Sequence, residues 1–256
     1  MLNKVLLNLT LGAIGLSLLW PVYAGAPAKV DEVAPVGELV QEAEAKIKML
    51  EDYLATDKSF NESKVTSLPR DASVLAVLSQ AISESSQASG WKSSAKDVRD
   101  GAIAVWQSKT YDDAKKGLEK IKAAHAGNAG DAKPEHDWNK LGKLGSLMKE
   151  VNVRKGKLTL QTRKNKTLTP QQSEEFARDA SVLAVLGLAI HDDTHEVKSQ
   201  SKEEIAEWQK YANDFRTEMT AAANALRKGD VKAGGDGVKK GNSACNECHG
   251  KFRPNE

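Results

Sequence analysis

Apolar residues recur at intervals of three and four along most of the chain, a spacing typical of amphipathic α-helices. One such stripe comprises Val36, Val40, Ala43, Ile47, Leu50 and Leu54. A longer one comprises Ile205, Trp208, Ala212, Phe215, Met219, Ala222 and Leu226. Alternating runs typical of strands are scarce, and aromatic residues make up only 5% of the chain. The pattern predicts an all-α protein.

A nine-residue stretch occurs twice. Arg70–Leu78 recurs unchanged as Arg178–Leu186, 108 residues later, and Ala81-Ile82 is matched by Ala189-Ile190 at the same offset. The repeat is too long for a solenoid unit and has the size of a small domain. We therefore predict two tandem antiparallel four-helix bundles, over residues 35–128 and 136–256.

Capping signals divide the second copy into four predicted helices. The first spans about residues 137–151 and is followed by a basic, flexible stretch over 154–167. The second starts at Thr169, with Pro170 and Gln172 completing a capping box, and the third starts at Ser201. Gly229 ends the third helix, and the fourth begins near residue 230. In the first copy, helices are expected from the 36–54 stripe, from Ser67, over 94–107 and over 111–124.

The first residues have the features of an export signal. Lys4 precedes a mostly apolar run from Val5 to Leu19, and Val22-Tyr23-Ala24 offers small residues at the positions that a signal peptidase reads. The run is short for a membrane span. We predict that residues 1–24 are a cleaved signal peptide, the alternative being an uncleaved N-terminal anchor. The mature chain would then be exported and would not span the membrane.

Net charge and composition bear on the class of partner and on the kind of core. The net charge is +2, which gives no argument for nucleic-acid binding. Hydrophobic residues make up 40% of the chain, enough for packed helical cores.

The two cysteines belong to the stretch Cys245-Asn-Glu-Cys248-His249, which has the C-x-x-C-H form of a covalent haem attachment site. A structural zinc site would need a fourth ligand, and no second cysteine pair supplies it. A thioredoxin-like pair would need a βαβ context, which the pattern lacks. The motif predicts one haem c, with iron. An alignment of the copies puts His125, Asn128 and Ala129 where Cys245, Cys248 and His249 stand, so the first copy would bind no haem c.

Four helices with C-x-x-C-H at the end of the last one resemble the cytochrome c prime family and its low-spin bundle relatives. The resemblance covers most of residues 137–256 and depends on Cys245–His249 and on Met148 in the first helix. It implies that His249 is the axial iron ligand. In low-spin members a first-helix residue is the sixth ligand. High-spin members have an open or apolar distal side, and some bind nitric oxide or carbon monoxide. Haem c is matured on the periplasmic side in bacteria, so the periplasm is the expected compartment.

Helix direction places further candidates near the haem. In an up-down-up-down bundle the end of the fourth helix lies near the start of the first, the end of the second and the start of the third. Met148, about ten residues into its predicted helix, is either the sixth ligand or a core residue. His191 and His195 are four apart on one predicted helical face. They would contact the haem periphery, or favour the end of the helix through its dipole.

These observations predict a periplasmic electron carrier with one haem c, acting between redox partner proteins. The alternative is a gas-binding haem protein with an open distal site. An enzymatic function is not expected, because only His191 or His195 would supply a distal acid–base group. Since members of the family often dimerise, the haem-free copy would either take the place of a second subunit, giving a monomeric pseudo-dimer, or dock a partner.

Overall fold

The structure, a computed structural model, describes residues 29–87, 90–128, 130–132 and 136–253. Within these ranges it contains ten α-helices, one short 3-10 helix and no strand, so the all-α prediction is confirmed. None of these helices combines the length and the apolar character of a membrane span. The predicted signal peptide, residues 1–24, lies outside the described residues.

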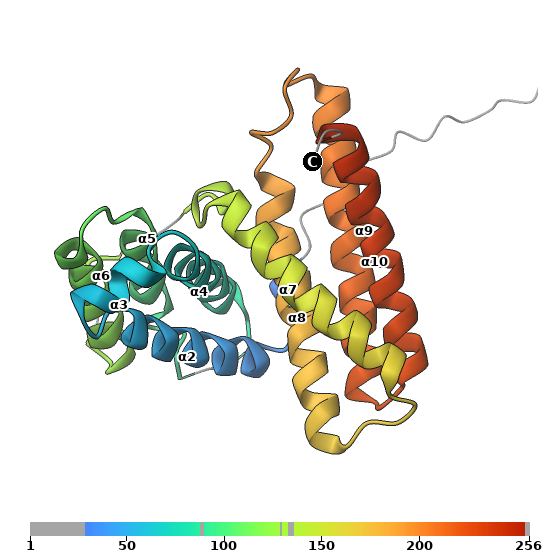
Figure 1. Cartoon of the computed structure of the whole chain (residues 1–256), viewed down its shortest axis with the longest axis horizontal. Helices are drawn as coiled ribbons and strands as arrows, with labels where there is room; N and C mark the ends of the chain where they lie inside the picture. The colour runs from blue at the N-terminus through green and yellow to red at the C-terminus, as the bar shows by residue number, and fades with distance from the viewer. Residues whose placement is uncertain (1–28, 88–89, 129, 133–135, 254–256) are drawn as a thin grey trace, which may run out of the picture.

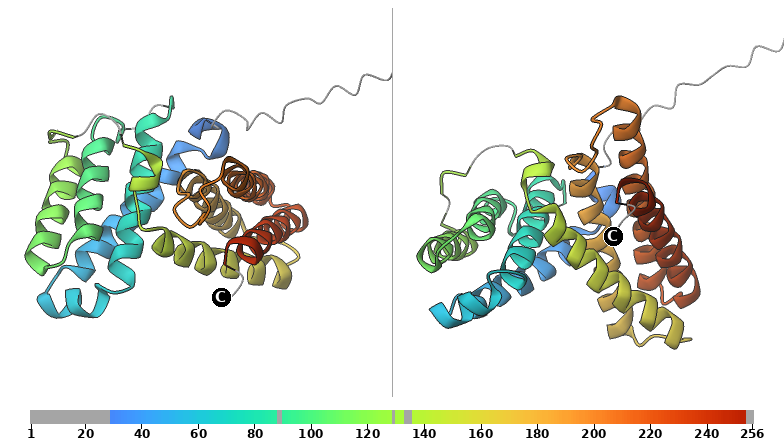
Figure 2. Two further views of the ribbon diagram at one scale, coloured as in Figure 1. Left: turned by 90° about the horizontal axis from the view of Figure 1, so that it is seen from above. Right: turned by 45° about the horizontal axis from the view of Figure 1, so that its top comes forward.

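The helices fall into two groups that lie side by side in every view (Figures 1 and 2). The N-terminal group comprises α1 (Val30–Val33), α2 (Val36–Tyr53), α3 (Asp57–Ser63), α4 (Ser67–Glu84), α5 (Ala95–Gln107) and α6 (Tyr111–His125). Its four longer helices begin and end close to the predicted positions, whereas the short α3 was not predicted. Thr56 caps α3, because its side chain accepts a hydrogen bond from the Ser59 amide at 3.1 Å.

The C-terminal group comprises η1 (Trp138–Lys140), α7 (Leu144–Lys164), α8 (Pro170–Asp192), α9 (Lys202–Arg227) and α10 (Val231–Phe252). The predicted capping box at the start of α8 is present, with both of its hydrogen bonds between Thr169 and Gln172. Gly229 adopts a φ of +74°, which allows α9 to end there. Asp230 caps α10 through the Ala233 amide.

The predicted bounds of α7 were wrong at both ends. The segment 137–143 forms only one 3-10 turn, because the amide of Lys143 donates to the Ser73 hydroxyl of the other group, at 3.2 Å, instead of continuing a helix. At its far end α7 continues to Lys164, where a flexible stretch was expected. Arg154 and Leu158 are both buried along this part of the helix, so packing holds it in place.

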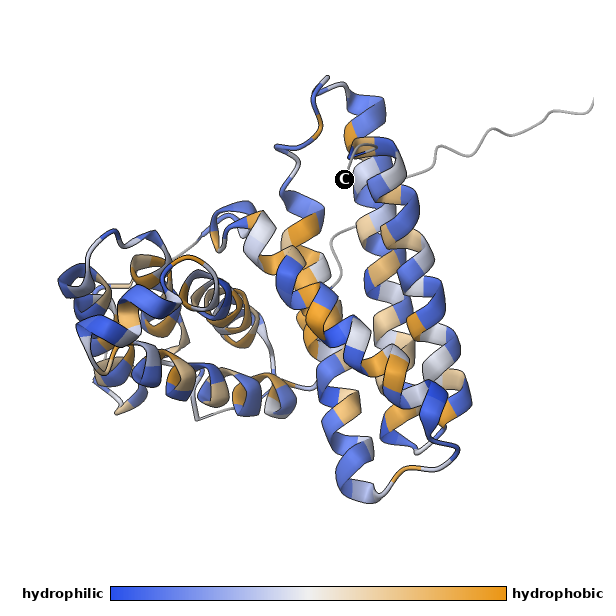
Figure 3. Ribbon diagram, viewed as in Figure 1, coloured by the Kyte–Doolittle hydropathy of each residue, from blue (hydrophilic) through white to orange (hydrophobic). Residues whose placement is uncertain are grey.

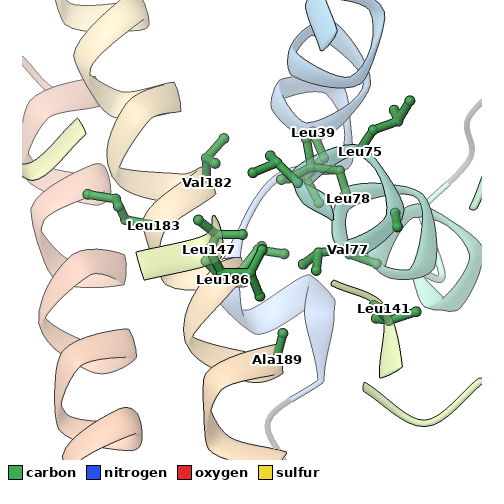
Figure 4. Close-up of a cluster of buried hydrophobic side chains, with 14 of the residues drawn as sticks. Leu39, Leu75, Val77, Leu78, Leu141, Leu147, Val182, Leu183, Leu186 and Ala189 are labelled. Atoms are coloured by element: carbon green, nitrogen blue, oxygen red, sulfur yellow. The ribbon is translucent and has the colours of Figure 1, made fainter. Parts of the chain in front are cut away.

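Both groups share one hydrophobic core. Helices α4 and α8, which contain the repeated stretch, contact each other, while α2 packs on α8 and α7 packs on α4. Figure 4 shows side chains of both halves meeting there, including three pairs that are 108 residues apart: Leu39 and Leu147, Leu75 and Leu183, and Leu78 and Leu186. Polar residues lie mainly on the outward faces of the helices (Figure 3).

A buried cluster of charged side chains lies beside this core, where α2 and α4 meet α7 and α8. Each half contributes four of them, again 108 positions apart: Glu42 and Glu150, Lys46 and Arg154, Arg70 and Arg178, and Asp71 and Asp179. The ammonium of Lys46 lies 2.6 Å from Asp71 of its own half and 2.9 Å from Glu150 of the other half.

The second half repeats this arrangement. Arg154 pairs with Asp179 of its own half, at 2.5 Å, and with Glu42 of the first half. Burial disfavours the charged forms of Asp71 and Glu150, but the nearby ammonium and guanidinium groups outweigh it, so the pKa of each carboxyl lies below its usual value. Each half therefore presents the same patch to the other, as the subunits of a two-fold dimer do.

The tandem-bundle architecture itself stays a prediction. Helix α7 crosses α8 obliquely, and its first turns lie on the side of the N-terminal group (Figure 1). The two halves also share their core rather than closing two separate ones.

Candidate functional site

The cysteine–histidine motif lies in the last two turns of α10. Cys245 and Cys248 are three residues apart, so both thiols lie on one side of the helix. Both are free, Cys248 is buried and Cys245 is half-buried. His249 follows directly and is half-buried, and within the described part of the chain its ring makes no hydrogen bond or ion pair. The imidazole is therefore available as a ligand.

A cavity of about 630 Å³ opens beside His249. Helix α10, the start of α7 and the segment that joins α8 to α9 form most of its wall. Its lining includes Met148, His195, Trp208, Cys248, His249 and Phe252. An apolar cleft of about 30 Å³ continues it between α7, α9 and α10, and there Cys245 joins Cys248 and His249. Both thiols and the imidazole thus line adjoining spaces.

Met148 lines both the cavity and the apolar cleft, and it is half-buried. Because α7 begins at Leu144, Met148 is the fifth residue of its helix, not the tenth as predicted. The change places the thioether on the first turns of α7, at the level where α10 ends. The structure thus brings Met148 and His249 to the same space.

Two aromatic rings form the inner wall. Trp208 is only 2% exposed, and its indole N–H donates to the carbonyl of Ile190 at 2.7 Å. Phe252 packs edge-on against it, with 5.3 Å between ring centroids. These contacts fix an apolar surface next to Cys248 and exclude water from it.

Burial controls the chemistry of the two thiols. It raises the pKa of Cys245, and burial with the negative charges around it raises the pKa of Cys248 to about 12. A reactive redox pair or a zinc site would instead stabilise the thiolate. In the described residues, moreover, no group of three or more His, Cys, Asp or Glu side chains is placed to hold a metal ion.

The two histidines predicted at the haem periphery lie at different sites in the structure. Helix α8 ends at Asp192, so His195 lies in the following segment and the two rings do not share a helical face. His195 is 60% exposed, is paired with Asp193 and lines the cavity. His191 is paired with Asp192 at 2.7 Å and lines a different hollow, beside α1 and Arg216. The structure brings only His195 to His249.

The matching position in the first half makes an aromatic contact instead. His125, which aligns with Cys245, packs edge-on against Trp91, with 5.2 Å between ring centroids. Trp91 is itself buried.

Sequence reasoning missed one residue of the cavity wall from the first half. Trp106, in α5, lines the cavity together with the turn formed by residues 142–145. No signal of spacing or composition would have placed it there, because it comes from the copy without the motif. Trp208 was predicted as part of the helical stripe and, at the start of the third helix, near the haem.

The side chains at this site match the groups that a covalently bound haem requires from a protein. A porphyrin provides four nitrogen ligands, so its iron needs only axial side chains from the protein. His249 and Met148 offer these, the two free thiols offer attachment, and Lys143 and Arg253 lie on the cavity wall where carboxylates would be neutralised. The cavity volume lies within the range of about 300–1,000 Å³ that is usual for ligand sites.

Comparison of the chain with protein-family models, curated proteins and solved structures finds no match. The resemblance to the cytochrome c prime family therefore depends on the Cys245–His249 motif and on the helical plan.

Proposed function

We propose that this chain is an exported c-type cytochrome with one haem, which transfers electrons between redox partner proteins in the periplasm. The observation that supports it best is the placement of Cys245, Cys248 and His249 around space that also contains Met148. The apolar wall formed by Trp208 and Phe252 suits a porphyrin face.

Attachment requires no oxidant. Each thiol adds across one vinyl group: the sulfur bonds to the carbon next to the ring, the S–H hydrogen ends on the terminal carbon, and nothing leaves. A bound haem iron supplies one-electron exchange. His249 and Met148 would hold the iron, while Lys143 and Arg253 would pair with the propionates. No substrate acid–base pair is needed. Among the described residues of the cavity wall, the exposed His195, which is paired with Asp193, is the only histidine besides His249.

The test is production of the full chain in bacteria that mature c-type cytochromes. We expect a denatured band that retains peroxidase activity and a mass increased by one whole haem. Replacement of both Cys245 and Cys248 by Ser should abolish both signals. His125→Ala, at the aligned position of the first half, is the matched control and should leave them unchanged. A wild-type protein without attached haem would refute the proposal.

A gas-binding function is the second candidate, because Met148 is half-buried beside an open cavity rather than locked in the core. The two functions differ in the sixth ligand. An electron carrier should be low-spin and should lose its sixth ligand in Met148→Ala, whereas Met49→Ala, on an exposed position of the haem-free half, should change nothing. High-spin ferrous wild type that binds carbon monoxide rapidly would favour gas binding.

We also propose that the haem-free half takes the place of a second subunit, so that the protein works as a monomer. The reciprocal ion pairs between the halves support this arrangement. Sedimentation should give the mass of one chain, and a stable two-chain species would contradict it.

A further inference from the structure

The turn that leads into α7 is held by the haem-free half. The indole N–H of Trp106 donates to the carbonyl of Leu141 at 2.9 Å, and the amide of Lys143 donates to the Ser73 hydroxyl at 3.2 Å. Between them, Gly142 lies so close that a Cβ there would be 2.7 Å from the Cβ of Ser73. Three consecutive contacts thus fix this turn to α4 and α5.

The same turn lines the haem cavity. Gly142, Lys143, Leu144 and Gly145 belong to its wall, and the ring of Trp106 lies on it as well. Met148 follows one helical turn after Leu144, which is itself buried. Because a helix is rigid over one turn, the position of this turn sets the position of the Met148 backbone, from which the thioether reaches the cavity.

Trp106 also contributes to the walls of two spaces. It lines the cavity beside His249 and a hollow of about 610 Å³ that reaches over α5 and α6 of the haem-free half. Asn139 and Gly142 are shared by both walls. A shift of the indole would therefore open the haem cavity toward the first half.

We propose that the haem-free half positions the distal side of the haem site, with Trp106 and Ser73 as positioning residues that hold the turn before Met148 and limit access to the cavity. This inference depends on the proposed function. It gives the first half a role in setting the sixth position of the iron, although it has no haem motif of its own.

The experiment compares Trp106→Phe, Ser73→Ala and the double variant with wild-type holoprotein. Phenylalanine keeps the ring but cannot donate to Leu141. We expect carbon monoxide to associate with the ferrous protein about five- to tenfold faster in each single variant, as one hydrogen bond no longer restrains the turn, and faster still in the double variant. The reduction potential should shift in parallel. This expectation holds whether Met148 must dissociate first or the distal position is already open.

Trp91→Phe is the matched control, because Trp91 is a buried indole of the same half that does not line the cavity. It should lower the melting temperature at least as much as Trp106→Phe and leave the association rate and the potential unchanged. The inference is overturned if the Trp106 and Ser73 variants have wild-type rates, or if Trp91→Phe raises the rate equally. In both cases attached haem would leave the proposed function intact, whereas a wild type without haem would overturn both.

Discussion

Replacing Arg154 by Met should test the charged cluster between the two halves. The guanidinium lies 2.8 Å from Glu150 and 2.5 Å from Asp179, and it also pairs with Glu42. Arg154 is 8% exposed, so water cannot replace these contacts without local opening. Methionine matches the aliphatic part of the arginine side chain and keeps its apolar packing, so the change removes mainly the guanidinium charge and its hydrogen bonds.

The expected loss of unfolding free energy depends on the charged neighbours that Glu42 retains in the variant. Glu42 would keep only Lys46 and Arg178, each at 3.9 Å, beyond hydrogen-bond distance. Removing one partner of a buried ion pair costs about 3–5 kcal/mol, because it leaves a charge buried without compensation. That is a large part of the total stability of an ordinary domain, about 5–15 kcal/mol. We expect the loss to lie within this range.

Urea unfolding followed by circular dichroism measures the free energy of unfolding. Lys232→Met is the control, because its ion pair with Asp236 lies on an 88% exposed side chain, and it should cost less than about 0.5 kcal/mol. Adding Glu42→Gln to the Arg154 variant should recover part of the loss, since it removes the uncompensated carboxylate. A loss below about 1 kcal/mol for Arg154→Met would show that the cluster is not an essential support of the interface.

Three other predictions concern stability. The pKa values of Asp71 and Glu150 are lowered in the folded protein, so the two carboxylates contribute stability that is full above about pH 5. This stability is lost as the pH falls through about 4 toward the folded pKa values. The melting temperature should therefore fall steeply with pH in this range, and Asp71→Asn should make the fall less steep. Thr169→Ala should cost about 1 kcal/mol in urea unfolding through loss of the α8 capping box; no change would contradict the cap. Gly101→Ala should destabilise by about 1–3 kcal/mol, since its Cβ would lie 2.7 Å from Ile121, whereas Gly156→Ala, with open space around it, should stabilise by up to about 1 kcal/mol in the same assay.

Sequence periodicity predicted the helices well wherever a local signal exists. The stripes, the caps at Thr169 and Ser201 and the start of the last helix near residue 230 depend on neighbours within one or two turns, so the sequence alone suffices. The same reasoning failed at both ends of α7. Its start is decided by Ser73, 70 residues earlier, and its continuation by partners of Arg154 on α2 and α8.

The candidate site was predictable to the same extent. Cys245, Cys248 and His249 form a contiguous motif and needed no tertiary information. The contribution of Trp106 depends on how the two halves pack, which no local pattern encodes. The charged cluster, by contrast, could have been predicted from the sequence. Arg70-Asp71 and Arg178-Asp179 lie inside the repeated stretch, and two charged residues in an otherwise apolar run indicate buried ion-pair partners.

The reciprocity of the charged cluster has a consequence for dissection of the molecule. A polypeptide comprising only the second half would expose Glu150 and Arg154 on one surface, with opposite charges at matching positions. In a pair of such polypeptides, Glu150 of each copy would pair with Arg154 of the other, as the two halves of the intact chain pair with each other. Truncation would thus convert an intramolecular contact into self-association, and the shortened protein would have a stability that depends on its concentration.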